Sequence, residues 1–258
     1  MNNEQIPRAW KKNILNGLSY DTPIYRIFSC RRFEQMMSTN ELVLVNPEKW
    51  DDPFENFYLK VNAFMGEEKV SLESLRKGWF GQCWTLNEDT DAMWRIYSPE
   101  KDGVRLKTTT GKLFRAIIDQ QGILADFGSF IGTVEYLSKE ELQNYHKQTF
   151  SETLTNGGLA SMLLRKRTAF LHEAEVRVLA SLSSEYLFEY EDGLYQVKID
   201  FEDIFDEICL DPRLEKESFE KLKSKLEEKT NIPIIQSDLY KFDFEPIRFD
   251  IEVSEDER

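Results

Sequence analysis

Short apolar stretches recur along the whole chain, and several alternate apolar with polar residues in the two-residue period of a half-buried strand. They predict strands over residues 23–29, 41–45, 79–86, 103–108, 129–137, 174–180, 194–199 and 232–236. Apolar positions three and four apart predict helices over residues 31–38, 68–77, 91–97, 111–120, 159–169 and 214–229. The two kinds of element interleave without the strict alternation of a parallel βαβ fold. We therefore expect an α+β protein with a mixed, largely antiparallel sheet and flanking helices.

No internal repeat and no linker-like segment divides the pattern. The 258 residues fit one large domain or two small ones, and we expect a single compact domain over residues 1–258. Residues 1–20 are expected to form an N-terminal helical arm, because apolar positions over 5–18 have helical spacing. Residues 252–258 are polar and are expected to fray.

Charge and composition narrow the range of partners. The chain has 47 acidic and 33 basic residues and a net charge of −14, so bulk nucleic-acid binding and membrane-surface binding are not expected. No apolar run is long enough to cross a membrane, and the first residues do not resemble a signal peptide. Three widely spaced cysteines (Cys30, Cys83 and Cys209) predict reduced thiols and a cytoplasmic location. Only His146 and His172 are histidines, so no metal site is expected.

Residues 172–178, HEAEVRV, carry the clearest candidate chemistry. On a strand, Glu173, Glu175 and Arg177 would share one face, each about 6.6 Å from the next. Two neighbouring carboxylates tend to separate their pKa values, so that one acts as an acid and the other stays ionised. The same pattern also fits a solvent-exposed strand face on which charges pair weakly.

Aromatic residues near a second predicted strand form another candidate. Trp84 and Thr85 end that strand, and Trp94 and Tyr97 lie three residues apart on the helix that follows. An aromatic stripe of this kind is typical either of a packed core or of a surface on which a flat base or a nicotinamide ring stacks.

Two further segments carry weaker indications. Residues 50–55, WDDPFE, predict a turn pinned by aromatic side chains, and a metal at Asp51 and Asp52 would need additional ligands. Tyr25 and Arg26 lie on the first predicted strand. They matter for function only if Arg26 faces the same cleft as the glutamates.

Taken in order, four motifs resemble a bacterial family of uncharacterised domains. They are Tyr25-Arg26, NPEKWDDPFE over 46–55, CWT…MWRIY…GV over 83–104, and KRTAFLHEAEVRV over 166–178. The resemblance spans roughly residues 23–240 and implies no function by itself.

A looser resemblance concerns the order of an early arginine, a central hydroxyl residue and a late Glu-x-Glu, which is similar to the ADP-ribosyltransferase fold. It implies that NAD is a substrate, that Arg26 holds the dinucleotide and that Thr85 supports the site. It further implies that Glu175 is the catalytic glutamate and that Glu173 handles the acceptor. The central motif is Cys-Trp-Thr rather than the Ser-Thr-Ser of that fold.

The chemistry implied by this resemblance suits the residue types. Breaking the nicotinamide–ribose bond builds positive charge on the sugar, which an ionised Glu175 would stabilise while Glu173 accepts a proton. Arg26 and Arg177 would hold pyrophosphate oxygens, although Arg177 could instead pair with Glu175. The nicotinamide would stack on one of three aromatic residues: Trp84, Trp94 or Tyr97.

Two functional hypotheses follow. The first is an NAD-consuming, ADP-ribosyltransferase-like enzyme with an unknown protein or nucleic-acid acceptor, acting in bacterial antiviral defence or as a toxin. It predicts that Glu175, Arg26 and an aromatic side chain converge on one cleft. The second is a non-catalytic binding or regulatory module that holds a nucleotide or a protein in an aromatic groove. It predicts that the two glutamates form structural ion pairs with Arg165, Lys166 or Arg167.

Overall fold

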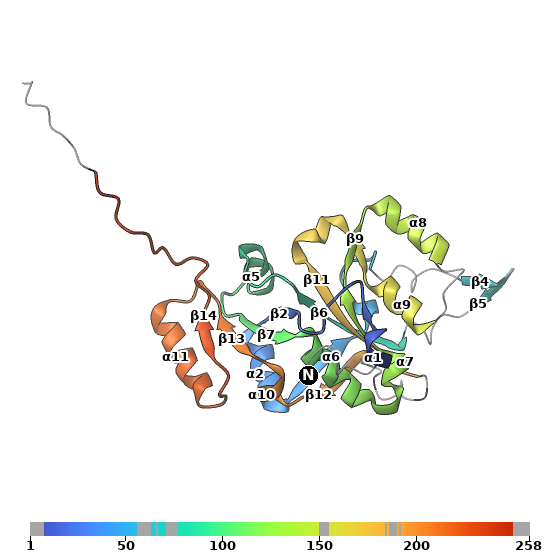
Figure 1. Cartoon of the computed structure of the whole chain (residues 1–258), viewed down its shortest axis with the longest axis horizontal. Helices are drawn as coiled ribbons and strands as arrows, with labels where there is room; N and C mark the ends of the chain where they lie inside the picture. The colour runs from blue at the N-terminus through green and yellow to red at the C-terminus, as the bar shows by residue number, and fades with distance from the viewer. Residues whose placement is uncertain are drawn as a thin grey trace, which may run out of the picture.

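The computed structural model describes residues 8–55, 63–65, 67–70, 77–149, 155–183, 185, 190 and 192–249. Its frame is a ten-stranded sheet (Figure 1). Eight strands follow one another across it, in the order β1 (Ile14–Leu15), β8 (Ser129–Thr133), β11 (Glu175–Ser181), β6 (Trp79–Thr85), β2 (Pro23–Phe28), β7 (Val104–Thr109), β13 (Glu207–Leu210) and β14 (Ile234–Gln236). The remaining two are β3 (Glu41–Val45), which also borders β6, and β12 (Leu194–Lys198), which borders β3.

Within this sheet, β1 pairs with β8 and β13 pairs with β14 in parallel, and the other neighbours are antiparallel. Two small sheets pair β9 (Glu135–Leu137) with β10 (Arg165–Arg167) and β4 (Ala63–Met65) with β5 (Glu68–Val70). The expected fold class, a single compact α+β domain with a mixed, largely antiparallel sheet, is confirmed.

Helices flank the sheet and fill its connections. The α-helices are α1 (Arg8–Lys11), α2 (Cys30–Thr39), α5 (Asp91–Tyr97), α6 (Thr110–Gln121), α7 (Ala125–Gly128), α8 (Lys139–Thr149), α9 (Asn156–Leu163), α10 (Phe201–Ile204) and α11 (Lys216–Glu227). The short 3-10 helices are η2 (Pro47–Lys49), η3 (Gly122–Leu124) and η4 (Thr168–Glu173). Among the residues described, no helix is long and apolar enough to cross a membrane.

The two faces of the sheet support separate apolar clusters, because successive side chains of a strand point to opposite faces. On β6, Phe80 and Trp84 join the larger cluster, to which α6 contributes Phe114. Trp79 of β6 and Leu179 of β11 join the smaller cluster, which α9 covers. The polar ends of β6 and β11 extend beyond this smaller cluster, and the candidate site lies there.

The N-terminal segment differs from the predicted helical arm over 1–20. Its described part is helical only over Arg8–Lys11, and Ile14–Leu15 then adds to the edge of the main sheet. Asn16 and Gly17 follow with φ angles of 56° and 71°, which an α-helix cannot contain. The predicted frayed tail over 252–258 lies outside the described residues.

Three other ranges differ because of pairings that local pattern does not reveal. The predicted strand over 129–137 forms β8 and β9, which belong to different sheets. The predicted helix over 159–169 ends as α9 at Leu163, and the chain continues as β10 because it pairs with β9. The predicted helix over 68–77 begins with β5, and residues 71–76 lie outside the described chain.

Candidate functional site

A cavity of about 650 Å³ opens where the main sheet forks. β11 pairs along the whole of β6 on one edge. On the other edge, Thr85 pairs with Tyr25 of β2, and Gly81 pairs with Val45 of β3. On this edge, β2 therefore pairs with β6 only at Thr85 and β3 pairs with it only at Gly81. Cys83 lies between these two positions, at the fork.

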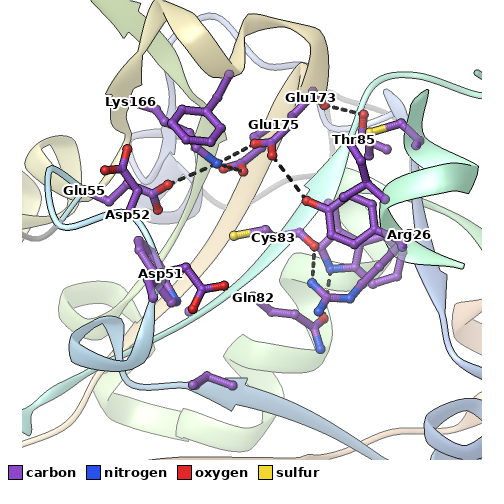
Figure 2. Close-up of a pocket in the computed structure, with 18 of the residues that line it drawn as sticks. Arg26, Asp51, Asp52, Glu55, Gln82, Cys83, Thr85, Lys166, Glu173 and Glu175 are labelled. Carbon is purple, nitrogen blue, oxygen red and sulfur yellow. Dashed lines mark hydrogen bonds and ion pairs between the residues drawn. The ribbon is translucent and has the colours of Figure 1, made fainter. Parts of the chain in front are cut away.

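One side chain of β2 and one of β6 bind backbone carbonyl oxygens inside the fork. The guanidinium of Arg26 donates from Nη1 to the carbonyl oxygen of Cys83, and the Gln82 amide donates to the Val43 carbonyl oxygen at 3.0 Å. Figure 2 shows Arg26 and Gln82 at one side of the cavity, and Glu55, Lys166 and Glu175 across from them. The cavity therefore has two chemically distinct sides.

Glu175 is the first residue of β11, and its carboxylate is held by two cations. Arg177 donates from Nε to Glu175 Oε2 at 2.7 Å, and Lys166 Nζ lies 2.7 Å from Oε1. Arg177 also donates from Nη2 to Glu55 Oε2 at 2.8 Å and from Nη1 to the Leu163 carbonyl oxygen at 2.7 Å. Arg177 is fully buried and does not line the cavity. Its positive charge therefore neutralises Glu175 from inside the protein.

Lys166 gathers three carboxylates from three segments of the chain. Its ammonium contacts Glu175, then Glu55 Oε1 at 3.0 Å, and also Glu173 Oε2. An ammonium has three donors. Lys166 donates hydrogen bonds to Glu173 and Glu175, and Glu55 lies within ion-pair distance. Three carboxylates against the two cations Lys166 and Arg177 give the cluster a net charge of −1 when all are ionised.

The two glutamates of the pair separate their pKa values. Burial raises the pKa of Glu173 to about 7, aided by the hydrogen bond and charge of Glu175 and opposed by Lys166. Burial acts in the same direction on Glu175, but Arg177, Glu173 and Lys166 outweigh it and lower that pKa to about 2. One carboxylate is therefore ionised, and the other gains or loses a proton near neutral pH.

Glu173 reaches this pair from a turn rather than from the strand. It ends η4, and Ala174 then adopts a left-handed conformation with φ 42°. Thr85 fixes this turn by donating from its hydroxyl to the Glu173 carbonyl oxygen at 2.6 Å. The prediction that Glu173, Glu175 and Arg177 share one strand face is wrong for Glu173, because β11 begins only after it.

Arg26 is a cation of the cavity wall that has no carboxylate partner among the described residues. No ion pair joins it to another residue in the part of the chain that the structure describes, and its buried Nε has no hydrogen-bond partner there. Its guanidinium also lies 5.1 Å from the Phe28 ring centroid. Burial lowers the pKa of Arg26, since little around it offsets the charge. An anionic ligand would supply the missing charge partner.

Several aromatic side chains line the cavity, although not all those predicted. Tyr97 is 40% exposed and lies 3.4 Å from Glu173 Oε1 through its hydroxyl, and Phe170 packs 4.5 Å from Lys166 Nζ. Trp84 borders the cavity but is 2% exposed. Trp94 is fully buried and donates to Asp89, so the prediction that it stacks on a ligand is wrong.

The loop over 46–55 forms the wall of the cavity across from Arg26 (Figure 2). Asn46 fixes its start by donating to the Trp79 carbonyl oxygen at 3.1 Å. Further along, the Trp50 ring lies 4.4 Å from the Arg177 guanidinium and over Gly81, where an added Cβ would come within 2.9 Å of the indole. A glycine at position 81 thus gives Trp50 the space to lie on the sheet.

Seven of the nine predicted site residues lie around this one cavity: Tyr25, Arg26, Trp84, Thr85, Tyr97, Glu173 and Glu175. Trp94 and Arg177 do not line it. For Arg177, the alternative that it pairs with Glu175 is the observed arrangement, so the prediction that it holds pyrophosphate is wrong.

Sequence reasoning did not place Lys166, Glu55 or Trp50 in the site. The basic run over 165–167 indicated possible ion pairs, as the binding-module hypothesis predicts, and Lys166 forms two of them with the predicted glutamates. Glu55 and Trp50 belonged to a motif interpreted as a turn, and only the tertiary fold brings that loop over β6. Among the described residues, no group of three or more His, Cys, Asp or Glu side chains is placed to hold a metal ion.

Residues 93–178 match the model of a family described as "Protein of unknown function (DUF2971)". The chain resembles this uncharacterised family. The matched part runs from α5 to β11 and contains Tyr97, Lys166, Glu173 and Glu175. No curated protein matches the sequence.

Solved structures with a similar arrangement include three of DarT from Thermus sp. 2.9. The complex with NAD+ is 11% identical with a TM-score of 0.39, and the match covers 85% of this chain and 97% of that chain. The complex with ADP-ribosylated ssDNA is 11% identical with a TM-score of 0.38 and coverages of 86% and 96%. The complex with carba-NAD+ is 12% identical with a TM-score of 0.36 and coverages of 84% and 96%.

Proposed function

We propose that the protein is an NAD-consuming enzyme of the ADP-ribosyltransferase type, with Glu175 as the catalytic glutamate. The observation that carries this proposal is the arrangement of opposite charges around one cavity. A carboxylate that is ionised at neutral pH and one with a pKa of about 7 lie on one side, and a guanidinium without a carboxylate partner lies on the other.

The carboxylate side suits glycosidic bond cleavage. When the bond between ribose C1′ and the nicotinamide nitrogen breaks, its electron pair neutralises the pyridinium and positive charge develops on the ribose. Ionised Glu175 stabilises that charge, since the cluster around it is negative overall when Glu173 is also ionised. An acceptor nucleophile then bonds to C1′, and Glu173 takes the proton that it releases.

The opposite side suits the pyrophosphate of NAD. Arg26 presents a planar guanidinium that can bind two phosphate oxygens at once, and a bound anion satisfies its charge. Tyr97 and Phe170 offer accessible rings for the flat nicotinamide. Tyr25, Thr85 and Trp84 shape the cavity wall in this proposal.

The wider setting is part of the same proposal. The acceptor is a group on a protein or a nucleic acid, the location is cytoplasmic, and the role is that of a bacterial defence or toxin effector. Three free cysteines, Cys30, Cys83 and Cys209, are consistent with a reducing compartment.

One observation favours the second candidate, a non-catalytic module that binds a nucleotide. That hypothesis predicts ion pairs between the glutamates and the basic run, and Lys166 contacts both Glu173 and Glu175. The two candidates differ in turnover: the module binds a nucleotide and leaves it intact.

The test is to incubate the protein with NAD and measure nicotinamide release by chromatography, alongside calorimetric binding of ADP-ribose. We expect release by the wild type and none by Glu175→Gln. Because Glu175 is buried between two cations, this variant also loses stability, so folding is checked by circular dichroism. Arg26→Met is the second variant, and we expect it to bind ADP-ribose at least tenfold more weakly. Binding without release supports the module, and absence of both overturns the enzyme proposal.

A further inference from the structure

We infer that Lys166 is a positioning residue, whose ammonium holds Glu173 and Glu175 next to each other and keeps the titration of Glu173 close to neutral pH. The inference rests on the proposed function, since it assigns Lys166 to the same site. It concerns a residue that does not itself act on the substrate.

Lys166 forms a cluster of ion pairs rather than a single ion pair, and we call Lys166 with Glu55, Glu173 and Glu175 the clamp. Lys166 lies on β10, Glu173 ends η4, and Glu175 begins β11, so one ammonium ties three consecutive elements together. Its side chain is 7% exposed, and Phe170 covers it at 4.5 Å. Solvent screening of these contacts is therefore weak.

Glu55 weakens the interaction of Lys166 with the other two glutamates. It contacts Lys166 at 3.0 Å through one oxygen and Arg177 at 2.8 Å through the other. It therefore competes with Glu175 for both cations and with Glu173 for Lys166. Without Glu55, Lys166 would interact more strongly with the remaining pair. Without Lys166, three carboxylates would face Arg177 alone.

Other titratable groups face the clamp and bear on its charge. Tyr97 of α5 lies near Glu173, and Tyr136 of β9 accepts a hydrogen bond at its hydroxyl from the Glu175 backbone N–H at 2.8 Å. Burial is the main reason that the pKa of both tyrosines is raised, and the negative charges of Glu173 and Glu175 raise it further. Both phenols therefore stay neutral in the range in which Glu173 titrates.

The experiment follows the glutamate carboxylates by NMR, using protein labelled with 13C at the glutamate side chain, titrated from pH 4 to 9 without any ligand. In Lys166→Met, loss of the ammonium should move the Glu173 midpoint upward by at least about one pH unit. Lys166→Arg keeps the charge and should restore part of the shift. Glu55→Gln should move the midpoint downward, because a competing negative charge is removed.

The matched control is Arg165→Met on the same strand. Arg165 is also buried, but its carboxylate partner is Glu135 at 3.0 Å, outside the cavity. We expect this variant to lose stability without moving the Glu173 midpoint. If Lys166→Met does not fold, the opposite shift in Glu55→Gln decides the question.

An unchanged midpoint in Lys166→Met or Glu55→Gln overturns the inference. The titration needs no NAD, so its result is separate from that of the proposed function. Absence of NAD cleavage and ADP-ribose binding in the wild type, together with the expected shifts, overturns the proposed function and leaves the role of Lys166 in positioning the pair.

Discussion

Replacing Glu173 with glutamine should stabilise the folded protein above neutral pH. Burial is the main reason that the pKa of Glu173 is about 7 instead of 4.5, so its ionised form is disfavoured in the native state. A glutamine imitates the protonated carboxyl at every pH and can still accept a hydrogen bond from Lys166. The variant thus removes the unfavourable ionisation without emptying the position.

The size and sign follow from proton binding in the folded and unfolded states. From pH 4.5 to 7 the folded protein holds the Glu173 proton that the unfolded chain has released, so stability falls as the pH rises. The folded and unfolded pKa values of Glu173 differ by about 2.5 units, and one unit corresponds to about 1.4 kcal/mol. The free energy of unfolding therefore falls by about 3 kcal/mol by pH 8. Glu175 acts in the opposite sense: its lowered pKa adds stability as the pH rises from about 2 to 4.5.

The pair therefore contributes a stability maximum near pH 4.5, and only its alkaline side depends on Glu173. We expect Glu173→Gln and the wild type to be about equally stable at pH 4.5, and the variant to be more stable at pH 8 by up to about 3 kcal/mol.

The assay is urea unfolding of the wild type and Glu173→Gln at both pH values. The exposed Glu100 provides the control Glu100→Gln, for which we expect the same small effect at each pH. Comparing variant and wild type at one pH cancels the titration of the other carboxylates. A variant that is no more stable than the wild type at pH 8 would refute the reasoning.

Three further predictions concern ligand binding and packing. The affinity for NAD+ relative to ADP-ribose should rise several-fold between pH 6 and 8, since in the proposed function ionised Glu173 would lie near the cationic nicotinamide ring; calorimetry at both pH values tests this, and Glu173→Gln should remove the dependence. Gly81→Ala should lower stability by about 1–3 kcal/mol, measured by thermal unfolding, because the new Cβ would lie 2.9 Å from both Trp50 and Leu179. Arg26→Met should leave the melting temperature unchanged or raise it, as no carboxylate is deprived of a partner, while ADP-ribose binding weakens; a large loss of stability would show that Arg26 is a structural residue.

Much of the fold could be predicted from local pattern. The strands over 23–28, 41–45, 79–85 and 104–109 have strong apolar periodicity, and each forms within a residue or two of its predicted ends. The small sheet of β9 and β10 could not be predicted in this way. A run such as Arg165–Arg167 has no strand pattern of its own and becomes a strand only through pairing with Glu135–Leu137.

The candidate site was predictable to the extent that its chemistry lies close together in sequence. The HExExR segment placed Glu173 and Glu175 near each other, but the left-handed turn at Ala174 was not visible in the pattern. Glu55 is distant from them in sequence and is brought to them by Lys166 and Arg177. The fork that creates the cavity depends on which strands β6 borders, and no local property of a strand encodes that choice.

The physical character of the glutamate pair bears directly on the choice between the two functional hypotheses. Buried ion clusters add little net stability, and apolar residues of similar size often serve a fold as well. A carboxylate whose pKa is raised to about 7 is destabilising at physiological pH, so Glu173 lowers the stability of the fold there. The enzyme and the binding module then differ in what Glu173→Gln loses. If the glutamate takes a proton during turnover, the variant gains stability and loses NAD cleavage while it still binds ADP-ribose. If the cluster only shapes a groove, the variant gains stability and keeps every activity that the wild type has.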